Sequence, residues 1–353
     1  DLRMSRGLGD VYKRQVLTWH QLTEDVSGSA TISPETFRKQ IQALSDAGCN
    51  TISLEQLRDY VYNGTPLPEK PIVLTFDDGY LSNYEDAFPV LGEYNMKATI
   101  FAIGVSIGKD TYKDTDHAMT PHFGAAEMQE MVDSGLISIQ SHTYDMHQWP
   151  PFEDGNDRVR ETLAQLPGES DEDYEAAVKA DIQQSQQAIE PITGEKVNAL
   201  SYPEGAYGTL TMDALRSQGI ELTFTTQPGV NAVVQGLPQT LYSMHRITMT
   251  EDTNMDEFLA GNGVYVQPEF ELATSDMIVQ FVRRNLGVGC VMRDFARDYV
   301  ESGLLFELRF NKIIPKRQFC VVRNTKMPMA PAAEKLLEIM ELDRQEELSL
   351  IHI

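Results

Sequence analysis

From Val16 to about Ala260 the sequence alternates short β-rich runs with amphipathic helical patterns. A strand-like run at residues 71–76 is followed by a helical pattern over residues 81–94 and by another strand-like run at residues 98–103. This order is typical of a parallel sheet covered by helices, and the almost wholly apolar run at 71–76 is typical of a strand buried on both faces. Because ligands bind such sheets beyond the carboxyl ends of the strands, we expect the chemistry to lie there.

Two adjacent carboxylates, Asp77 and Asp78, directly follow the apolar run at 71–76. Neighbouring like charges at the end of a buried strand are costly unless they are solvated, hydrogen-bonded or bound to a cation. If a metal ion is bound, one carboxylate can coordinate it while the other takes a proton from water. The alternative is an Asp-Gly turn, which Asp favours because its side chain bonds to nearby backbone. The pair alone leaves both interpretations open.

Two histidines, His142 and His147, follow a later strand-like run at residues 137–141. On a regular helix a spacing of five residues would splay the two rings by roughly 140°, so a loop or broken turn must bring them together. Imidazole and carboxylate form a mixed ligand set suited to zinc and other divalent transition metals, and three protein ligands with open positions mark a catalytic site. The alternative is two unrelated polar loop residues.

Composition excludes several classes of function. The formal net charge of -24 argues against a nucleic-acid binder, because nonspecific binding of backbone phosphates needs clustered Lys and Arg side chains. The longest apolar runs, such as residues 98–105, are well short of the roughly 18 residues that a membrane span needs. The three cysteines, Cys49, Cys290 and Cys320, lack metal-type spacing and support neither a disulfide framework nor a thiolate site.

The charge is unevenly placed along the chain. Residues 1–261 carry a net charge of -23 and residues 262–353 a net charge of -1, which indicates a boundary near Gly261. The ends look foreign to the fold: residues 1–15, which include Gly-Asp-Val-Tyr-Lys-Arg-Gln, and residues 346–353 resemble translated sequencing adaptors. The alternative for both ends is a disordered native tail.

Residues 16–260 resemble the polysaccharide deacetylase family. The resemblance rests on three motifs that occur in the family's order, namely Thr75-Phe76-Asp77-Asp78-Gly79-Tyr80, Ser141-His142-Thr143-Tyr144-Asp145-Met146-His147 and Ser201-Tyr202-Pro203-Glu204-Gly205. It implies an α/β fold, an irregular (β/α) barrel. It further implies that Asp77 is the general base and that Asp78, His142 and His147 bind one divalent metal ion, zinc first, with cobalt, manganese and nickel as alternatives.

Three departures from the family pattern affect the expected roles. The histidines are spaced by five residues instead of four, as in the branch similar to poly-N-acetylglucosamine deacetylases. The third motif begins with Ser201 where the family usually has an Arg that orients the base. The late segment that supplies the catalytic acid has no clear counterpart; His245 is the one candidate, against the interpretation that it is a surface loop histidine.

The resemblance implies hydrolysis of acetamide or acetyl ester groups on a polysaccharide such as peptidoglycan, a chitin-like polymer or poly-N-acetylglucosamine, outside the cell or at the cell envelope. We therefore expect the gene to continue upstream into a signal peptide or membrane anchor. The backbone N–H of Tyr80 would help to stabilise the oxyanion. Aromatic rings near the rim could stack on sugars or could simply pack. The expected substrate-contacting residues are Tyr80, Trp149, Tyr202, Pro203 and Tyr207, and His20 could line the same pocket.

Residues 263–345 resemble the closing half of the effector-binding domain of LysR-type transcriptional regulators. The match lies in residues 277–292, 302–310 and 328–340. It implies a partial α/β fragment, because neither a helix-turn-helix nor the first half of that domain precedes it. A fusion of two unrelated reading frames explains both halves. Two other functions remain open: a catalytically silent carbohydrate-binding module, and an effector-sensing fragment of a regulator.

Overall fold

The computed structural model describes residues 11–260, 279, 293–302, 304, 322–323 and 351–352. The chain divides into two compact units, Asp1–Pro268 and Glu269–Ile353. In the described part of the second unit, α9 spans Arg293–Glu301, and the two-residue strands β12 (Val322–Arg323) and β13 (Ile351–His352) pair in parallel. The rest of the predicted effector-binding fragment, Cys290 and Cys320 included, lies outside the described residues.

Nine strands of the first unit form one curved sheet, and all of its pairings are parallel except that between β1 and β10. The order is β10-β1-β5-β6-β7-β8-β9, with β11 also paired to β1 and β4 to β5. The strands are β1 (Val11–Trp19), β4 (Asn50–Thr51), β5 (Pro71–Phe76), β6 (Ala98–Ala102), β7 (Ile137–Ser141), β8 (Ala199–Ser201), β9 (Leu222–Phe224), β10 (Asn231–Val234) and β11 (Ile247–Thr248). A separate parallel pair is formed by β2 (Gln21–Leu22) and β3 (Thr31–Ile32).

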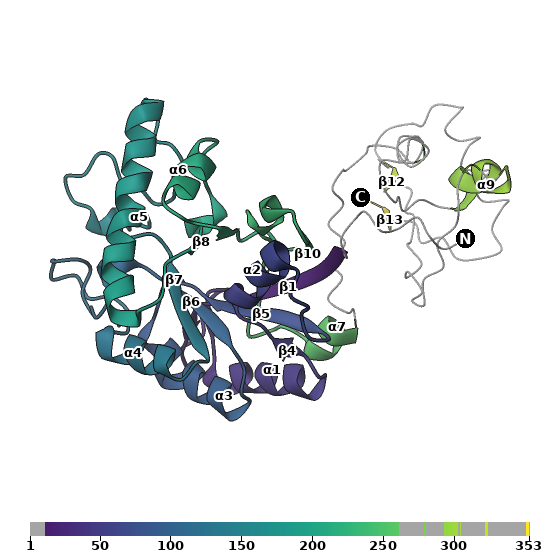
Figure 1. Cartoon of the computed structure of the whole chain (residues 1–353), viewed down its shortest axis with the longest axis horizontal. Coiled ribbons are helices and arrows are strands. Elements are labelled where there is room, and N and C mark those ends of the chain that lie inside the picture. The colour runs from purple at the N-terminus through teal and green to yellow at the C-terminus, as the bar shows by residue number, and fades with distance from the viewer. Residues whose placement is uncertain are drawn as a thin grey trace. The chain divides into compact units, whose positions relative to one another are not determined.

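Most of the helices follow the outer side of the sheet, so the first unit is an incomplete (β/α) barrel (Figure 1). The α-helices are α1 (Pro34–Asp46), α2 (Leu54–Asn63), α3 (Phe88–Glu93), α4 (Ala125–Asp133), α5 (Asp171–Thr193), α6 (Thr211–Ser217) and α7 (Met255–Ala260). Short 3-10 turns lie at η2 (Gly104–Ser106), η3 (Pro150–Phe152), η4 (Pro203–Gly205) and η5 (Pro238–Leu241). Among the described residues, none of the helices combines the length and the apolar character that a membrane crossing requires.

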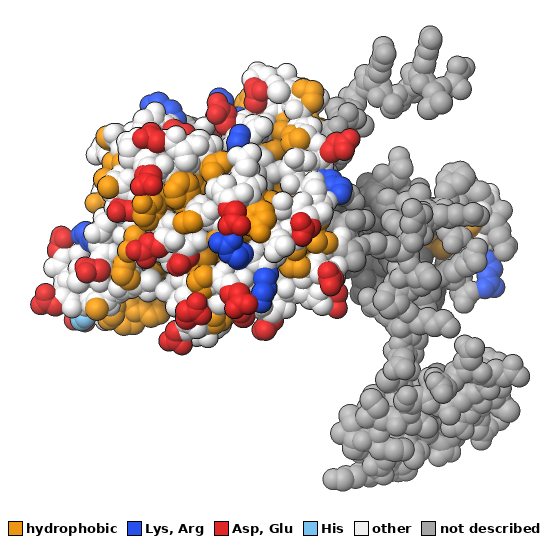
Figure 2. All heavy atoms as spheres, turned by 90° about the horizontal axis from the view of Figure 1, so that it is seen from below, with side chains coloured by type: hydrophobic (Ala, Val, Ile, Leu, Met, Phe, Trp, Pro, Cys, Tyr) orange, Lys and Arg blue, Asp and Glu red, His pale blue; other side chains and the backbone are white. Residues whose placement is uncertain are grey.

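Two apolar clusters pack against the two faces of the sheet. The larger one packs α1 and α3–α6 against the outer face, with Trp19, Phe37 and Phe76 in mutual ring contact at centroid distances of 5.5–5.7 Å. The smaller one lines the inner face and packs it against α2, with Val16 and Phe101 among its members. Since alternate residues of a strand face opposite sides, the strands β1, β5, β6 and β8 contribute to both clusters. The surface of the first unit is rich in acidic side chains on the face seen in Figure 2.

The structure differs from the sequence expectation at the N-terminal end of the first unit. Strand β1 begins at Val11 instead of Val16, because its first residues pair antiparallel with β10, from Val11 opposite Val234 to Arg14 opposite Asn231. Part of the predicted tail at residues 1–15 therefore belongs to the sheet, while residues 1–10 lie outside the described residues. In the tail predicted at residues 346–353, only β13 is described.

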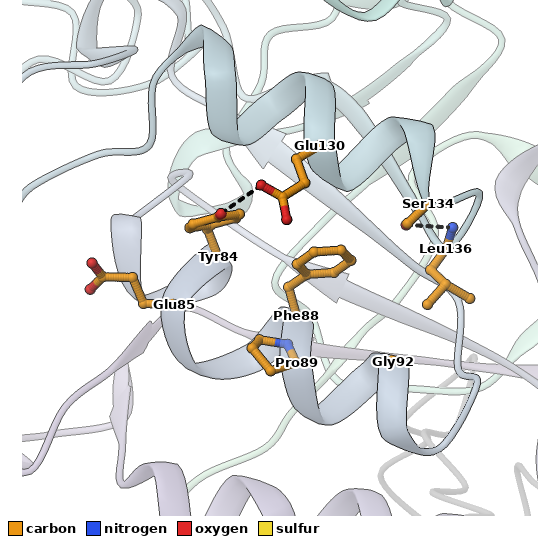
Figure 3. Close-up of a pocket in the computed structure, with 8 residues that line it drawn as sticks. All are labelled: Tyr84, Glu85, Phe88, Pro89, Gly92, Glu130, Ser134 and Leu136. Atoms are coloured by element: carbon orange, nitrogen blue, oxygen red, sulfur yellow. Dashed lines mark hydrogen bonds between the residues drawn. The ribbon is translucent and has the colours of Figure 1, made fainter.

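The predicted helix at 81–94 is divided. It begins with a π-helical turn, η1 (Asn83–Ala87), and continues as α3 from Phe88. Pro89 explains the division, because its ring clashes with the carbonyl four residues earlier and it has no N–H to donate, and a wider turn relieves both problems. A surface pocket of about 570 Å³ lies between this segment and α4 (Figure 3). It is lined by Tyr84, Glu85, Phe88, Pro89, Gly92, Glu130, Ser134 and Leu136, none of which belongs to the site below.

Candidate metal centre and active site

The carboxyl ends of neighbouring strands bring the predicted site residues to one edge of the sheet. His20 follows β1 and Asp77 follows β5, and the ends of these strands are in register, with Trp19 opposite Phe76. His142 follows β7 in the same way. The parallel register therefore places side chains far apart in the sequence beside one another.

Asp78, His142 and His147 offer three ligand atoms that lie within 4.8 Å of one another. The Nε2 atom of His142 lies 3.4 Å from Asp78 Oδ1, and that of His147 lies 3.8 Å from the same oxygen. Two ligand atoms that are each about 2.1 Å from a tetrahedral ion stand roughly 3.4 Å apart. Asp78 Oδ1 is buried and has no hydrogen-bond partner in the described part of the chain. The donor set and its spacing fit one divalent metal ion.

The second nitrogen of each imidazole is fixed by a backbone carbonyl. His142 Nδ1 lies 2.8 Å from Ser201 O, and His147 Nδ1 lies 3.2 Å from Glu161 O. When Nδ1 donates to a carbonyl, the lone pair is left on Nε2, the atom that faces Asp78. Burial lowers the pKa of His142, although Asp77 and Asp78 act in the opposite direction. The ring is therefore neutral, which is the form that binds metal.

Asp77 is held by a fully buried arginine that the sequence analysis missed. Arg246 donates from its two terminal nitrogens to the two oxygens of Asp77, at 2.7 and 2.6 Å. Ser201 Oγ donates to Asp77 Oδ2 at 3.0 Å and accepts from Arg246 at 2.8 Å. Burial alone would raise the pKa of Asp77, but the charge of Arg246 outweighs it and holds that pKa well below its usual range. Arg246 is thus positioned to orient Asp77. In the family pattern this task belongs to an Arg at the position that Ser201 occupies in the third motif.

His20 faces the same carboxylate. Its Nε2 lies 3.9 Å from Asp77 Oδ2, and its side chain is partly exposed at 20 %. Its Nδ1 is buried with no hydrogen-bond partner among the described residues, and its carbonyl accepts from Asn83 Nδ2 at 2.7 Å. His20 can therefore present one ring nitrogen to a group bound beside Asp77.

His245 has a different environment. Its backbone N–H and carbonyl both bond to the side chain of Asn231 at 2.8 Å, and its ring packs against Gly229. Within residues 11–260, no hydrogen bond or ion pair links His245 to Asp77, Asp78, His142 or His147. The structure therefore does not bring the candidate acid into the group of site residues. Its neighbour Arg246 reaches that group instead.

The predicted rim residues divide into buried and exposed ones. Tyr202 is fully buried and stacks beneath Tyr207 at a centroid distance of 4.4 Å, and Pro203 is buried as well. The expectation that Tyr202 and Pro203 contact sugar directly therefore does not fit their burial. Tyr207 and Trp149 are 41 % and 58 % exposed, so their rings are open to a ligand.

Tyr80 lies next to the metal-site carboxylate. The charge of Asp78, together with burial and a hydrogen bond to Asp78, raises the pKa of Tyr80, so that its phenol stays neutral. Tyr80 forms an antiparallel bridge with His122, and the hydrogen bonds of that bridge use Gly79 O and Leu81 N. In such a pair the central residue's own N–H points away from the ladder. The backbone N–H of Tyr80 is thus available to an external acceptor.

Comparison with known proteins agrees with this geometry. The family model described as polysaccharide deacetylase matches residues 64–223, the segment that contains Asp77, Asp78, His142 and His147. Residues 64–223 are thus similar to a polysaccharide deacetylase, and the first unit, which contains them, is called the deacetylase domain. A second model, LysR substrate binding domain, matches residues 234–343. Its first part, residues 234–260, belongs in the structure to the same unit as the deacetylase domain, because β11 pairs with β1.

Several relatives extend the match beyond the central segment. The chain is 28% identical to YxkH of Bacillus subtilis (strain 168), over 72% of this chain and 76% of that protein. It is 23% identical to the poly-beta-1,6-N-acetyl-D-glucosamine N-deacetylase of Escherichia coli (strain K12), over 69% of this chain and only 37% of the relative. Some relatives are therefore much longer than the segment in which they match this chain.

Solved structures match the first unit over nearly their full length. IcaB from Ammonifex degensii shares 27% identity with a TM-score of 0.57 and covers 72% of this chain and 97% of its own. A de-N-acetylase from Aggregatibacter actinomycetemcomitans has a TM-score of 0.60 at 24% identity, and covers 70% of this chain and 99% of its own. This second likeness concerns the fold alone.

Proposed function

We propose that the deacetylase domain is a metal-dependent hydrolase that removes acetyl groups from an N-acetylated or O-acetylated polysaccharide. The observation that carries this proposal is the convergence of Asp78, His142 and His147 beside the buried Asp77–Arg246 pair. A mixed carboxylate and imidazole ligand set next to an ionised, oriented carboxylate suits hydrolysis by activated water. The names of the relatives favour poly-N-acetylglucosamine as the first polymer to test, before peptidoglycan and chitin-like chains.

Each residue of the candidate site would perform a separate task in the reaction. A divalent ion held by Asp78, His142 and His147, zinc first and otherwise cobalt, manganese or nickel, would supply Lewis-acid chemistry at the acetyl carbonyl. Asp77 accepts the proton of the attacking water, and Arg246 keeps this carboxylate ionised and oriented. The backbone N–H of Tyr80 donates to the oxyanion that forms on the carbonyl oxygen. The carbon–nitrogen bond then breaks, and acetate leaves.

The proton for the leaving amine would come from His20. The Nε2 atom of His20 lies 3.9 Å from Asp77 Oδ2, and the His20 side chain is partly exposed. The backbone of His245 bonds instead to Asn231, and its ring packs against Gly229. An amine is a poor leaving group unless it is protonated, whereas an aryl alcohol leaves without help. We expect His20→Ala to lose most amide hydrolysis and to retain most hydrolysis of an aryl acetate.

The test is acetate release from poly-N-acetylglucosamine, chitooligosaccharides, peptidoglycan and acetylxylan, with and without a chelator. Asp78→Ala should lose metal and activity together, because two ligands make a poor site. Asp77→Asn should retain metal and lose most turnover, because it removes the proton acceptor and no ligand. Release from none of the polymers, or activity that survives complete removal of metal, would contradict the proposal and favour a silent carbohydrate-binding module.

The match at residues 234–343 supports a separate proposal for the second unit, that of an effector-binding fragment joined to the deacetylase by fusion of two reading frames. The charge difference across residue 261 supports the same view. A chain ending at residue 260 should then fold and act alone. The proposed site of action is extracellular or at the cell envelope, where such polymers occur. Secretion of the intact gene product in its source cells would test this.

A further inference from the structure

A buried carboxylate from α5 reaches the segment between the two metal-site histidines. Asp181 is 6 % exposed and lies on the side of α5 that faces β7. Its Oδ1 accepts the backbone N–H of Tyr144 at 2.8 Å, and its Oδ2 accepts that of Asp145 at 2.7 Å. Tyr144 and Asp145 are the central residues of the loop that runs from His142 to His147.

The location of Asp181 is costly for folding. Burial, together with the nearby charge of Asp145, raises the pKa of Asp181 to about 6 against the lowering effect of the two N–H donors and of Arg160. Among residues 11–260, Asp181 forms no ion pair. A buried carboxylate without an ion pair is destabilising unless its hydrogen bonds recover the cost, and charge-assisted bonds to backbone N–H groups are the strong kind. Because burial of a carboxylate costs free energy that an apolar side chain would not cost, the carboxylate points to a role beyond helix packing.

The same helix holds the start of the loop one turn later. Ser185 Oγ donates to Ser141 Oγ at 2.8 Å, and Ser141 Oγ accepts the N–H of Thr143 at 3.0 Å. Thr143 has a left-handed backbone with a φ of 70°, a conformation that a β-branched residue adopts only when its surroundings impose it.

The opposite side of the loop is fixed by backbone hydrogen bonds, and an ion pair of 2.9 Å joins Lys113 Nζ to Asp145 Oδ1 in the same loop. Gly104 N donates to Thr143 O at 3.0 Å, and Val105 N donates to Tyr144 O at 2.9 Å. The loop is therefore fixed between η2 on one side and α5 on the other. Since a helical spacing of five would separate the rings of His142 and His147, these contacts supply the geometry that the sequence spacing cannot.

We propose that Asp181 is a positioning residue for the metal centre, which sets the place of His147 relative to His142 and thereby the affinity for the ion. The proposal rests on the metal site put forward above. Groups that orient metal ligands without touching the metal typically change affinity by 10- to 100-fold when they are mutated. Asp181 acts through the backbone of the loop, and it touches neither metal nor substrate.

The experiment compares Asp181→Asn with Asp173→Asn in the full chain. Asparagine is isosteric but offers one acceptor oxygen, and its NH2 group faces a backbone N–H, so one of the two loop contacts is lost. Asp173 is exposed on the first turn of the same helix and serves as the matched control. We expect the Kd for Zn²⁺ and Co²⁺, measured by competition with a chromophoric chelator, to rise 10- to 100-fold in Asp181→Asn and to stay within about twofold in the control.

Two further measurements separate positioning from general stability. At saturating Co²⁺ the visible absorption of the ion should differ between Asp181→Asn and the wild-type protein, because it reports coordination geometry. If Asp181→Asn does not fold, Ser185→Ala removes the neighbouring loop contact with a smaller change and should still weaken metal binding several-fold. Unchanged Kd values and an unchanged spectrum would overturn the positioning role. A wild-type protein that binds no metal would instead refute the proposed function itself.

Discussion

Replacement of Arg246 by Met tests the buried pair on which the general base depends. The two hydrogen bonds to Asp77 are 2.7 and 2.6 Å long and both side chains are buried, so solvent screens them little. At an effective dielectric constant of about 20, charges roughly 4 Å apart attract by about 4 kcal/mol. Removal of one partner from such a pair typically costs about 3–5 kcal/mol, because the other charge stays buried alone. We expect Arg246→Met to lower the free energy of unfolding by that amount.

The assay is urea unfolding in the presence of a chelator, which removes any contribution of bound metal to stability. Asp77→Asn alone should also destabilise, because it leaves the guanidinium without its counter-charge. The double variant Asp77→Asn with Arg246→Met should then be at least about 2 kcal/mol more stable than the sum of the single effects predicts. Single effects that add to within about 0.5 kcal/mol would refute the energetic coupling of the pair.

Three further outcomes follow from the site. The folded-state pKa of Asp181, about 6, lies above the ordinary value of 3.8, so the native state binds more protons between these two pH values and loses stability as the pH rises. In chelator, Asp181→Asn should gain up to about 3 kcal/mol relative to the wild type from pH 4 to 7, and a flat difference would contradict this. Gly104→Ala places a Cβ 2.6 Å from the Tyr144 ring and should weaken metal binding, whereas Gly92→Ala, with open space around it, should not. Tyr207→Ala should raise KM for polymer more than it lowers kcat, since it removes an exposed ring; an unchanged KM would exclude a contact with substrate.

The convergence of the candidate ligands at one edge of the sheet was predictable, because the strands that precede them are visible in the apolar pattern. Asp77 and Asp78 stand after β5, and His142 stands after β7, where parallel pairing brings strand ends together. The five-residue spacing also predicted a loop before His147, and the structure has one. Local pattern and strand register were sufficient for this part of the site.

Arg246 and Asp181 could not be found in the same way, because nothing near them in the sequence marks their partners. Arg246 is 169 residues from Asp77, and Asp181 belongs to a helix that is acidic along much of its length. One signal was present for Asp181. It lies on the same stripe as Val178, Ile182 and Ile189, and a carboxylate within an apolar stripe of a helix is unusual unless it has a buried partner.

The segment matched by the deacetylase family model contains Asp77 and the three candidate ligands, but neither His20 nor Arg246. These two residues stand at β1 and beside β11, strands that pair with each other although more than two hundred residues separate them. Under the proposed function, the central segment therefore encodes the metal ligands and the base, whereas its two flanks encode the proton donor and the residue that orients the base. Under the proposed function, a descendant that kept the central motifs and lost His20 or Arg246 would keep its metal ligands and would no longer turn over its substrate. Among proteins of this kind, the flanking strands and not the central motifs should distinguish enzymes from their inactive descendants.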